Sequence, residues 1–149
     1  MGTHSLIIMR VKNPNGTYII YAVLYQQYDG SPEGVGVGSK LFNFLNNMKI
    51  VNGIRSSYAD QKVANGAGDL FAQIVGLFKT QVGGVYLAEP IDEELEEYNY
   101  YVTVDENNKI LISVTSSERE VVFSGTAEEM LTFFELDEDE SGIPYKVKV

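Results

Sequence analysis

The chain has 149 residues, of which 44% are hydrophobic, and it carries a net charge of -10, no cysteine and one histidine. This length and composition predict a folded domain rather than a disordered chain. The missing cysteines exclude disulfides and thiolate metal sites, and one histidine excludes a histidine-rich metal site within one chain. We expect a single domain over residues 1–149, with a partly flexible acidic tail from about residue 135, and no cofactor.

The negative charge is concentrated in the second part of the chain. Residues 1–88 carry seven basic and four acidic side chains, a net +3, whereas residues 89–149 carry four basic and seventeen acidic ones, a net -13. This charge repels nucleic acids and anionic membranes, while the first part can hold a small anion. No apolar run approaches the ~20 residues of a membrane helix, and the first ten residues lack the basic region of a signal peptide. We expect an intracellular protein that binds neither nucleic acid nor membrane.

Two strands, over residues 5–11 and 17–28, are predicted to form a hairpin. The intervening Pro14 and Gly16 suit a type I turn followed by a bulge. If residues 12 and 17 close this turn, the numbers of cross-strand partners sum to about 29, which places His4 opposite Tyr25. Because side chains alternate along a strand, Tyr25, Gln27 and Asp29 should share the face of His4.

The glycine-rich segment 29–38 excludes regular structure. A helix is predicted next, from Ser39 to Met48, with a buried stripe of Leu41, Phe42, Leu45 and Met48. Residues 55–64 are polar and suggest a loop. Asn65 has the position of an N-cap for a second helix, and Gly83-Gly84 ends that segment. Its broad apolar face consists of Leu70, Phe71, Ile74, Val75, Leu77 and Phe78.

The rest of the chain predicts strands and one short helix. A strand begins at Val85, an acidic loop covers residues 89–97, and a meander follows over residues 98–104, 110–115 and 120–123. Thr126 and Glu129 have the spacing of a capping box, which predicts a helix from Ala127 to Glu135. The fold class is therefore α+β, with a central, mostly antiparallel sheet built from the hairpin and the meander, and two or three helices packed on it.

The candidate site is a polar cluster at the end of the first hairpin. Strand ends beside flexible loops favour ligands, and backbone amides at a helix N-terminus favour anions. The segment from Gly34 to Lys40 does not match a phosphate loop, because Ser39 precedes the lysine instead of following it. The interpretation is a pocket for a small, anionic, nucleotide-like ligand. Its candidate residues are His4, Tyr25, Gln27, Asp29, Gly30, Gly34, Gly36, Asn52, Asn65, Gly66 and Lys79.

Several alternatives stay open at this point. The glycines could form a compact loop without a ligand. An enzyme, most plausibly a small hydrolase, would use His4 and Asp29, although no catalytic triad can be placed and the interpretation leans against catalysis. A third alternative is an acidic protein-interaction factor. It would act through Glu93, Glu94, Glu96 and Glu97.

The oligomeric state also stays open. Tyr98, Tyr100 and Tyr101 fit either a homo-oligomer interface or a sheet face covered by a helix.

Five ordered motifs resemble a family of short, uncharacterised proteins from bacteriophages, large DNA viruses and bacteria. Members open with Gly-Thr-Arg-Ser and carry Tyr-Arg-Gln-Phe/Tyr-Asp-Gly-Tyr-Pro-x-Gly-x-Gly, followed later by Ala-Asn-Gly-x-Gly. This chain differs at His4, Gln26 and Ser31, where relatives carry Arg, Arg and Tyr. The resemblance implies a host-interaction role, one form of which is sequestration of a nucleotide-derived immune signal. The motifs are Gly2–Ser5, Tyr25–Gly36, Ile50–Ile54, Val63–Gly68 and Gln73–Lys79 with Gly83–Leu87.

Overall fold

The computed structural model describes residues 2–58, 61–90, 96–118 and 120–136, and it has the α+β fold that the sequence predicts. A six-stranded sheet has the strand order β5-β2-β1-β6-β7-β8. Its strands are β1 (Ser5–Lys12), β2 (Tyr18–Gln26), β5 (Val85–Ala88), β6 (Tyr98–Val104), β7 (Ile110–Ser116) and β8 (Val121–Gly125).

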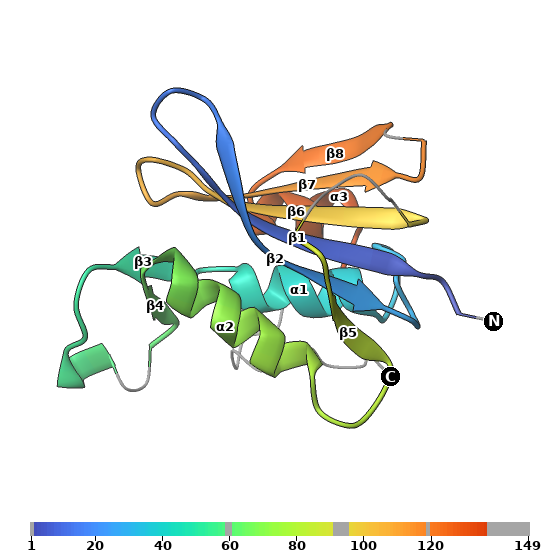
Figure 1. Ribbon diagram of the computed structural model, residues 1–149, viewed down its shortest axis with the longest axis horizontal. Coiled ribbons are helices and arrows are strands. Elements are labelled where there is room, and N and C mark those ends of the chain that lie inside the picture. The colour runs from blue at the N-terminus through green and yellow to red at the C-terminus, as the bar shows by residue number, and fades with distance from the viewer. Residues whose placement is uncertain (1, 59–60, 91–95, 119, 137–149) are drawn as a thin grey trace.

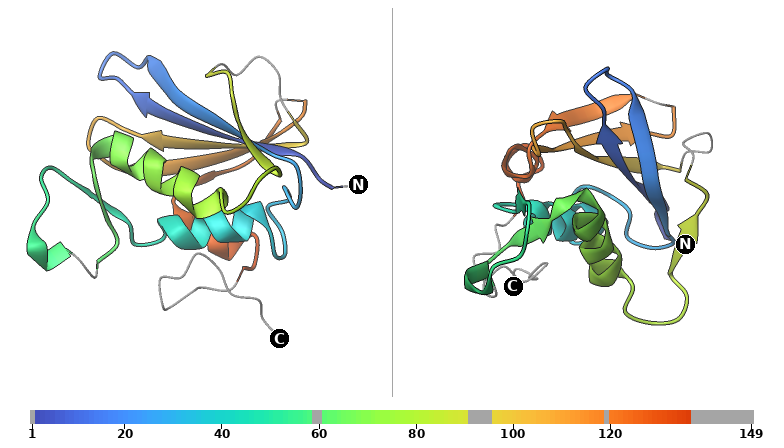
Figure 2. Two further views of the ribbon diagram at one scale, coloured as in Figure 1. Left: turned by 60° about the horizontal axis from the view of Figure 1, so that its bottom comes forward. Right: turned by 60° about the vertical axis from the view of Figure 1, so that its left-hand side comes forward.

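Three helices pack on one face of this sheet (Figures 1 and 2): α1 (Val37–Leu45), α2 (Gly66–Phe78) and α3 (Ala127–Phe133). All three contribute to one hydrophobic core, in which Phe42 of α1, Ile74 of α2 and Met130 of α3 are fully buried. No helix among the described residues has the length and apolar character needed to cross a bilayer.

The first hairpin forms as predicted, but its register differs from the predicted one. Near the turn the partner numbers sum to 30, as in Lys12 with Tyr18, and after a bulge between Met9 and Arg10 they sum to 31, as in Ser5 with Gln26. Strand β2 also ends at Gln26, two residues earlier than predicted. The bulge inserts an extra residue into β2, which sequence pattern does not reveal, and it shifts every later pair.

The hairpin joins the C-terminal meander through a parallel pair. β1 lies between β2, to which it is antiparallel, and β6, to which it is parallel. Ile7 and Tyr100 are partners in the parallel pair, and both are fully buried on the helix-covered face. Tyr100 therefore belongs to a covered sheet face, which is one of the two alternatives for the tyrosine cluster.

The first and third helices lie where the sequence predicts them, but their first or last residues differ from the predicted ones. α1 begins two residues before Ser39 and ends at Leu45, so Met48 lies beyond it and only partly buried against the core. α3 has the predicted capping box, in which Thr126 and Glu129 bond reciprocally, but it ends at Phe133.

The polar stretch after α1 contains structure that the sequence does not predict. β3 (Lys49–Val51) and β4 (Val63–Asn65) form a parallel two-stranded sheet, and a short 3-10 helix, η1 (Ser56–Tyr58), lies between them. Strands of three residues are too short to show a period-2 pattern. The predicted flexible tail falls mostly on residues 137–149, which lie outside the described residues.

Candidate functional site

The side chains of His4 and Tyr25 are in contact, although the cross-strand partner of Tyr25 is Leu6 and not His4 as predicted. Their rings make an edge contact with centroids 5.6 Å apart, and Tyr25 also lies 6.3 Å from Tyr86 of β5. The backbone N–H of His4 donates to Glu97 at 3.4 Å. Burial, followed by the negative charge of Glu96, raises the pKa of Tyr25. This ring cluster is on the sheet face opposite the helices, because Tyr25 packs against the small cluster of Leu6, Ile8, Val23 and Tyr101.

Asp29 lies in a different environment. It lines a cavity of about 180 Å³ with Gln26, the last residue of β2, and Tyr28, and His4 and Tyr25 are not among the lining residues. The chain turns sharply there, since Asp29 has a φ of 55° and its carbonyl accepts the N–H of Val37 at 2.9 Å. The predicted convergence of Tyr25 and Asp29 is therefore wrong, because β2 ends before strand alternation reaches Asp29.

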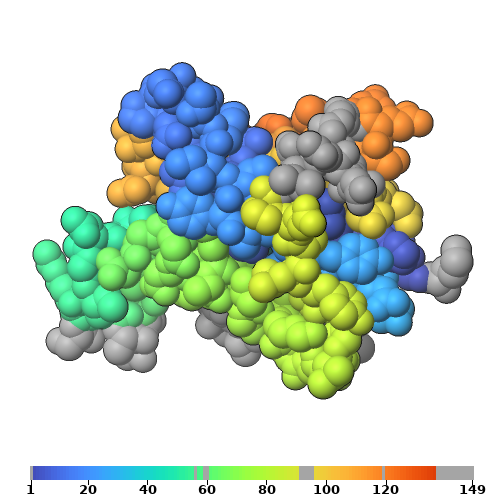
Figure 3. Space-filling model, in the orientation of Figure 1, coloured from blue at the N-terminus to red at the C-terminus, as the bar shows by residue number. Residues whose placement is uncertain are grey.

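The remaining walls of this Gln26 cavity come from the glycine loop and two helices. One side consists of Val35, Gly36 and Val37. The other lining residues are Lys40 of α1 and Phe78, the last residue of α2. The ammonium of Lys40 lies 5.3 Å from the centre of the Phe78 ring. The cavity thus combines apolar walls with one amide, one ammonium and one carboxylate. Figure 3 shows the segment from α2 to β5 covering the front of the molecule below the first hairpin.

Three predicted ligand residues lie at the opposite end of α2. Asn65 and Gly66 begin this helix, whereas Phe78, which lines the Gln26 cavity, ends it. A 13-residue helix spans about 18 Å, so these residues cannot contact the same small ligand. Asn65 is occupied by the fold, because its Oδ1 accepts the N–H of Gly53 at 2.8 Å and its own N–H donates to Asp69 at 2.7 Å. Asn52 lies at this same end, because it is next to Val51, the partner of Asn65 in the β3–β4 pair, and to Gly53, which donates to Asn65.

Lys79 and Gly30 are also held by the fold. The Lys79 ammonium donates to the carbonyls of Gly83 and Val85 at 3.2 and 2.7 Å. Gly30 donates its N–H to Thr3 at 2.9 Å, and its carbonyl accepts the hydroxyl of Tyr100 at 2.6 Å. The Gly30 amide is therefore not available to an anion.

Most of the loop glycines have a packing reason. A Cβ on Gly36 would lie 2.4 Å from the carbonyl oxygen of Asp29, one on Gly38 would lie 2.5 Å from the Cα of Pro32, and one on Gly30 would lie 2.7 Å from the Cβ of Ser5. Gly34 instead has a φ of 70° with open space around it. Close backbone packing thus accounts for a glycine content that resembles a phosphate cradle in sequence.

Gln26 is the residue that sequence reasoning missed. Its side chain is 4% exposed and lines the cavity, and its Nε2 has no hydrogen-bond partner. An unpaired buried amide costs about 1–3 kcal/mol. The signal was present in the sequence, because Gln26 follows Leu24 at the inward position of a strand with apolar inward side chains. The predicted neighbour, Gln27, follows the end of β2 and is not a lining residue.

Comparison of the chain with protein families, with curated proteins and with solved structures found no match. Among the described residues, no group of three His, Cys, Asp or Glu side chains is placed to hold a metal ion.

Proposed function

We propose that the chain binds a small anionic, nucleotide-like ligand in the Gln26 cavity without chemically altering it. The observation that carries this proposal is the Nε2 of Gln26, a buried donor without a hydrogen-bond partner, which lowers the stability of the fold. Buried polar groups almost always have partners. Because Gln26 lines a cavity, we infer that a bound ligand supplies the partner that its amide lacks.

The other lining groups support a ligand with a ring and a charge. Tyr28 is 56% exposed and offers an aromatic face for stacking, and Val35 and Phe78 supply apolar contact. Lys40 supplies positive charge, and the Asp29 carboxylate can accept hydrogen bonds from hydroxyl or amino groups. A cavity of about 180 Å³ is below the usual ligand-pocket range of roughly 300–1,000 Å³, so it would hold one moiety of such a ligand.

The resemblance to phage and virus proteins extends the proposal to a biological role. In that role the ligand is a nucleotide-derived host immune signal, and the protein sequesters it. Binding without turnover fits the placement of His4, which is not among the residues that line the cavity with Asp29.

Isothermal titration against ADP-ribose, a cyclic dinucleotide and adenosine monophosphate tests the proposal. We expect one of them to bind, and we expect Gln26→Met to weaken that binding by tenfold or more. Asp29→Asn should not weaken it, because asparagine tolerates the positive φ at position 29, keeps an oxygen that accepts hydrogen bonds and removes a charge of the ligand's own sign.

The matched control is Gln27→Met, which makes the same chemical change one residue along the chain and outside the cavity. Chromatography of the ligand released from heated protein should recover it unchanged. Binding that survives Gln26→Met would place the ligand elsewhere, and a converted product lost in His4→Ala would favour the hydrolase instead.

A further inference from the structure

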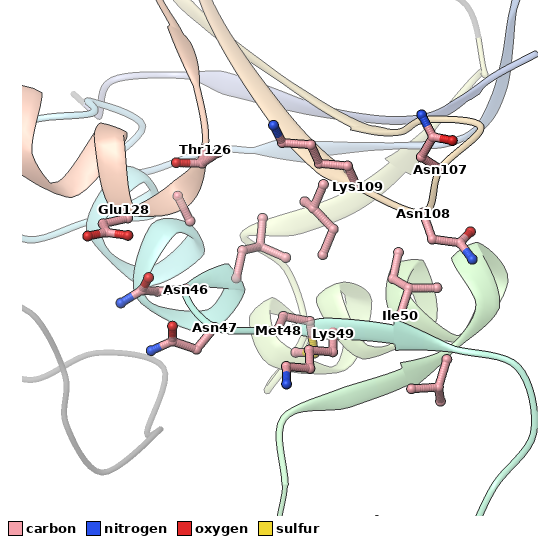
Figure 4. Close-up of a pocket in the computed structure, with 14 residues that line it drawn as sticks. Asn46, Asn47, Met48, Lys49, Ile50, Asn107, Asn108, Lys109, Thr126 and Glu128 are labelled. Atoms are coloured by element: carbon pink, nitrogen blue, oxygen red, sulfur yellow. The ribbon is translucent and has the colours of Figure 1, made fainter.

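A second cavity, of about 550 Å³, lies away from the Gln26 cavity and shares no lining residue with it. It opens between the end of α1, strand β3, the β6–β7 turn and the start of α3 (Figure 4). We call it the Asn-Lys cavity. Its volume is within the usual range for small-molecule pockets, roughly 300–1,000 Å³.

Two short segments with nearly the same sequence form facing walls. One is Asn46-Asn47-Met48-Lys49-Ile50, and the other, about sixty residues later in the chain, is Asn107-Asn108-Lys109-Ile110. In both, the second asparagine has left-handed backbone, with φ of 64° at Asn47 and 60° at Asn108. The two turns therefore deliver an Asn-Asn pair, a lysine and an isoleucine to the same cavity.

The cavity is apolar at its base and polar at its edge. Leu45, which is 3% exposed, and the half-buried Met48, Ile50 and Ile110 supply the apolar lining and pack against the hydrophobic core. Lys49 and Lys109 are exposed and lie on opposite sides of the cavity in Figure 4. Hydrogen bonds from Thr126, followed by the charge of Lys109, lower the pKa of Glu129, so Lys109 lies close to that carboxylate.

Two carboxylates lie near this cavity, and they have different surroundings. Glu129 is engaged by the Thr126 backbone, which donates to it at 2.9 Å, so the α3 N-terminus is already capped from within the chain. Glu128 lines the cavity and is exposed. Two exposed lysines therefore lie at this cavity, beside the exposed Glu128 and near the capping carboxylate of Glu129, in a chain whose net charge is -10.

We propose that the Asn-Lys cavity binds a small amphipathic anion, a molecule with an apolar body and a carboxylate, phosphate or sulfonate group. The apolar body would cover Met48, Ile50 and Ile110, and the anionic group would contact Lys49 or Lys109. The asparagine amides at the edge provide donors that hold the anionic group at the mouth. This site is independent of the proposed nucleotide-like ligand.

Titration with 8-anilinonaphthalene-1-sulfonate, whose fluorescence rises in an apolar site, tests the proposal on the full chain. We expect saturable binding to one site, and we expect octanoate to displace the dye at least fivefold more strongly than neutral 1-octanol. Backbone amide shifts in a two-dimensional NMR spectrum should move at Ile50 and Ile110 and not at Tyr28 and Asp29.

The double variant Lys49→Gln/Lys109→Gln should weaken dye binding about tenfold, because each exposed ion pair strengthens binding by roughly a few-fold. Lys12→Gln removes one charge on the first hairpin, outside the cavity, and should change the affinity less than twofold. Equal displacement by octanoate and octanol, unchanged affinity in the double variant, or shifts elsewhere than at Ile50 and Ile110 would each overturn the proposal.

Discussion

Ser5 and Gln26 are direct partners across the β1–β2 pair, and both bury a polar side-chain atom that has no hydrogen-bond partner. Ser5 is fully buried beneath Gly30, whereas Gln26 reaches the cavity. The end of the sheet below the glycine loop therefore contains two buried polar atoms that have no hydrogen-bond partner. Such a pair lowers stability, and it is retained where a ligand or a bound water completes it.

Replacing the unpaired amide should stabilise the protein while it removes binding. We expect Gln26→Met to raise the free energy of unfolding in ligand-free protein by about 1 kcal/mol, because it removes an unsatisfied polar group at nearly constant volume. Urea denaturation measures this change, and Gln27→Met should stay within about 0.5 kcal/mol of the wild type. A destabilised Gln26→Met would show that the amide is already paired in the folded chain, which removes the main argument for the ligand.

Two glycine-to-alanine changes should have opposite effects. Gly36→Ala places a methyl group 2.4 Å from the Asp29 carbonyl, so the loop must move, and we expect a loss of about 2 kcal/mol or more. Gly68→Ala in α2 meets nothing within 4 Å and should add roughly 0.5–1 kcal/mol through helix propensity. Thermal unfolding of both variants checks the pair, and equal effects would show that the loop does not pack as described.

The hydroxyl of Tyr100 ties the sheet to the glycine loop. It donates to the Gly30 carbonyl at 2.6 Å, so Tyr100→Phe should cost about 1–2 kcal/mol by leaving that buried carbonyl without its partner. Tyr98→Phe, on the same strand, is the matched control and should change stability little. A Tyr100→Phe variant as stable as the control would rule out this anchor.

Tyr100 also predicts an alkaline transition. Burial, followed by the charge of the neighbouring Tyr98, raises the pKa of Tyr100 above its ordinary value of 10.0. A raised pKa contributes stability that is fully present below about pH 10 and is lost as pH rises through the raised value, because only the unfolded phenol ionises freely. Unfolding followed from pH 8 to 11 should show a steeper loss in the wild type than in Tyr100→Phe.

The capping box of α3 predicts an acid dependence of the opposite sign. Hydrogen bonds from the Thr126 backbone, followed by those from its side chain, lower the pKa of Glu129. This stabilisation is present above the ordinary glutamate pKa of about 4.3 and is lost as pH falls through the lowered value. Glu129→Gln should therefore melt below the wild type at pH 7 and match it near pH 3, whereas Glu128→Gln should show no such convergence.

The sequence predicts those structural features of this protein that depend on residues close together in the chain. The helix stripe of Leu41, Phe42 and Leu45 and the Thr126 cap are local, and both are found as predicted. The bulge at Met9 and the parallel β1–β6 pair arise from contacts between distant segments, and no local pattern encodes them. The same distinction explains the candidate site, since the end of β2 decides whether Asp29 joins Tyr25 or Gln26.

The two cavities also differ in what sequence shows. The repeated Asn-Asn, Lys and Ile segments are visible in the sequence, but only the fold brings residues 46–50 to face residues 107–110. Gln26 could have been singled out as a polar residue at an inward strand position. Its importance became clear only from burial and the missing partner.

The central place of β1 has a consequence for synthesis of the protein. Ser5 to Val11 pair with Tyr98 to Val104, about ninety residues later, so one side of this strand stays unpaired until that part of the chain has left the ribosome. Contacts of such sequence separation form slowly, and an apolar strand with a bare edge invites pairing with other chains. Production at low temperature, or with a chaperone that shields nascent strands, should therefore increase the yield of correctly folded protein.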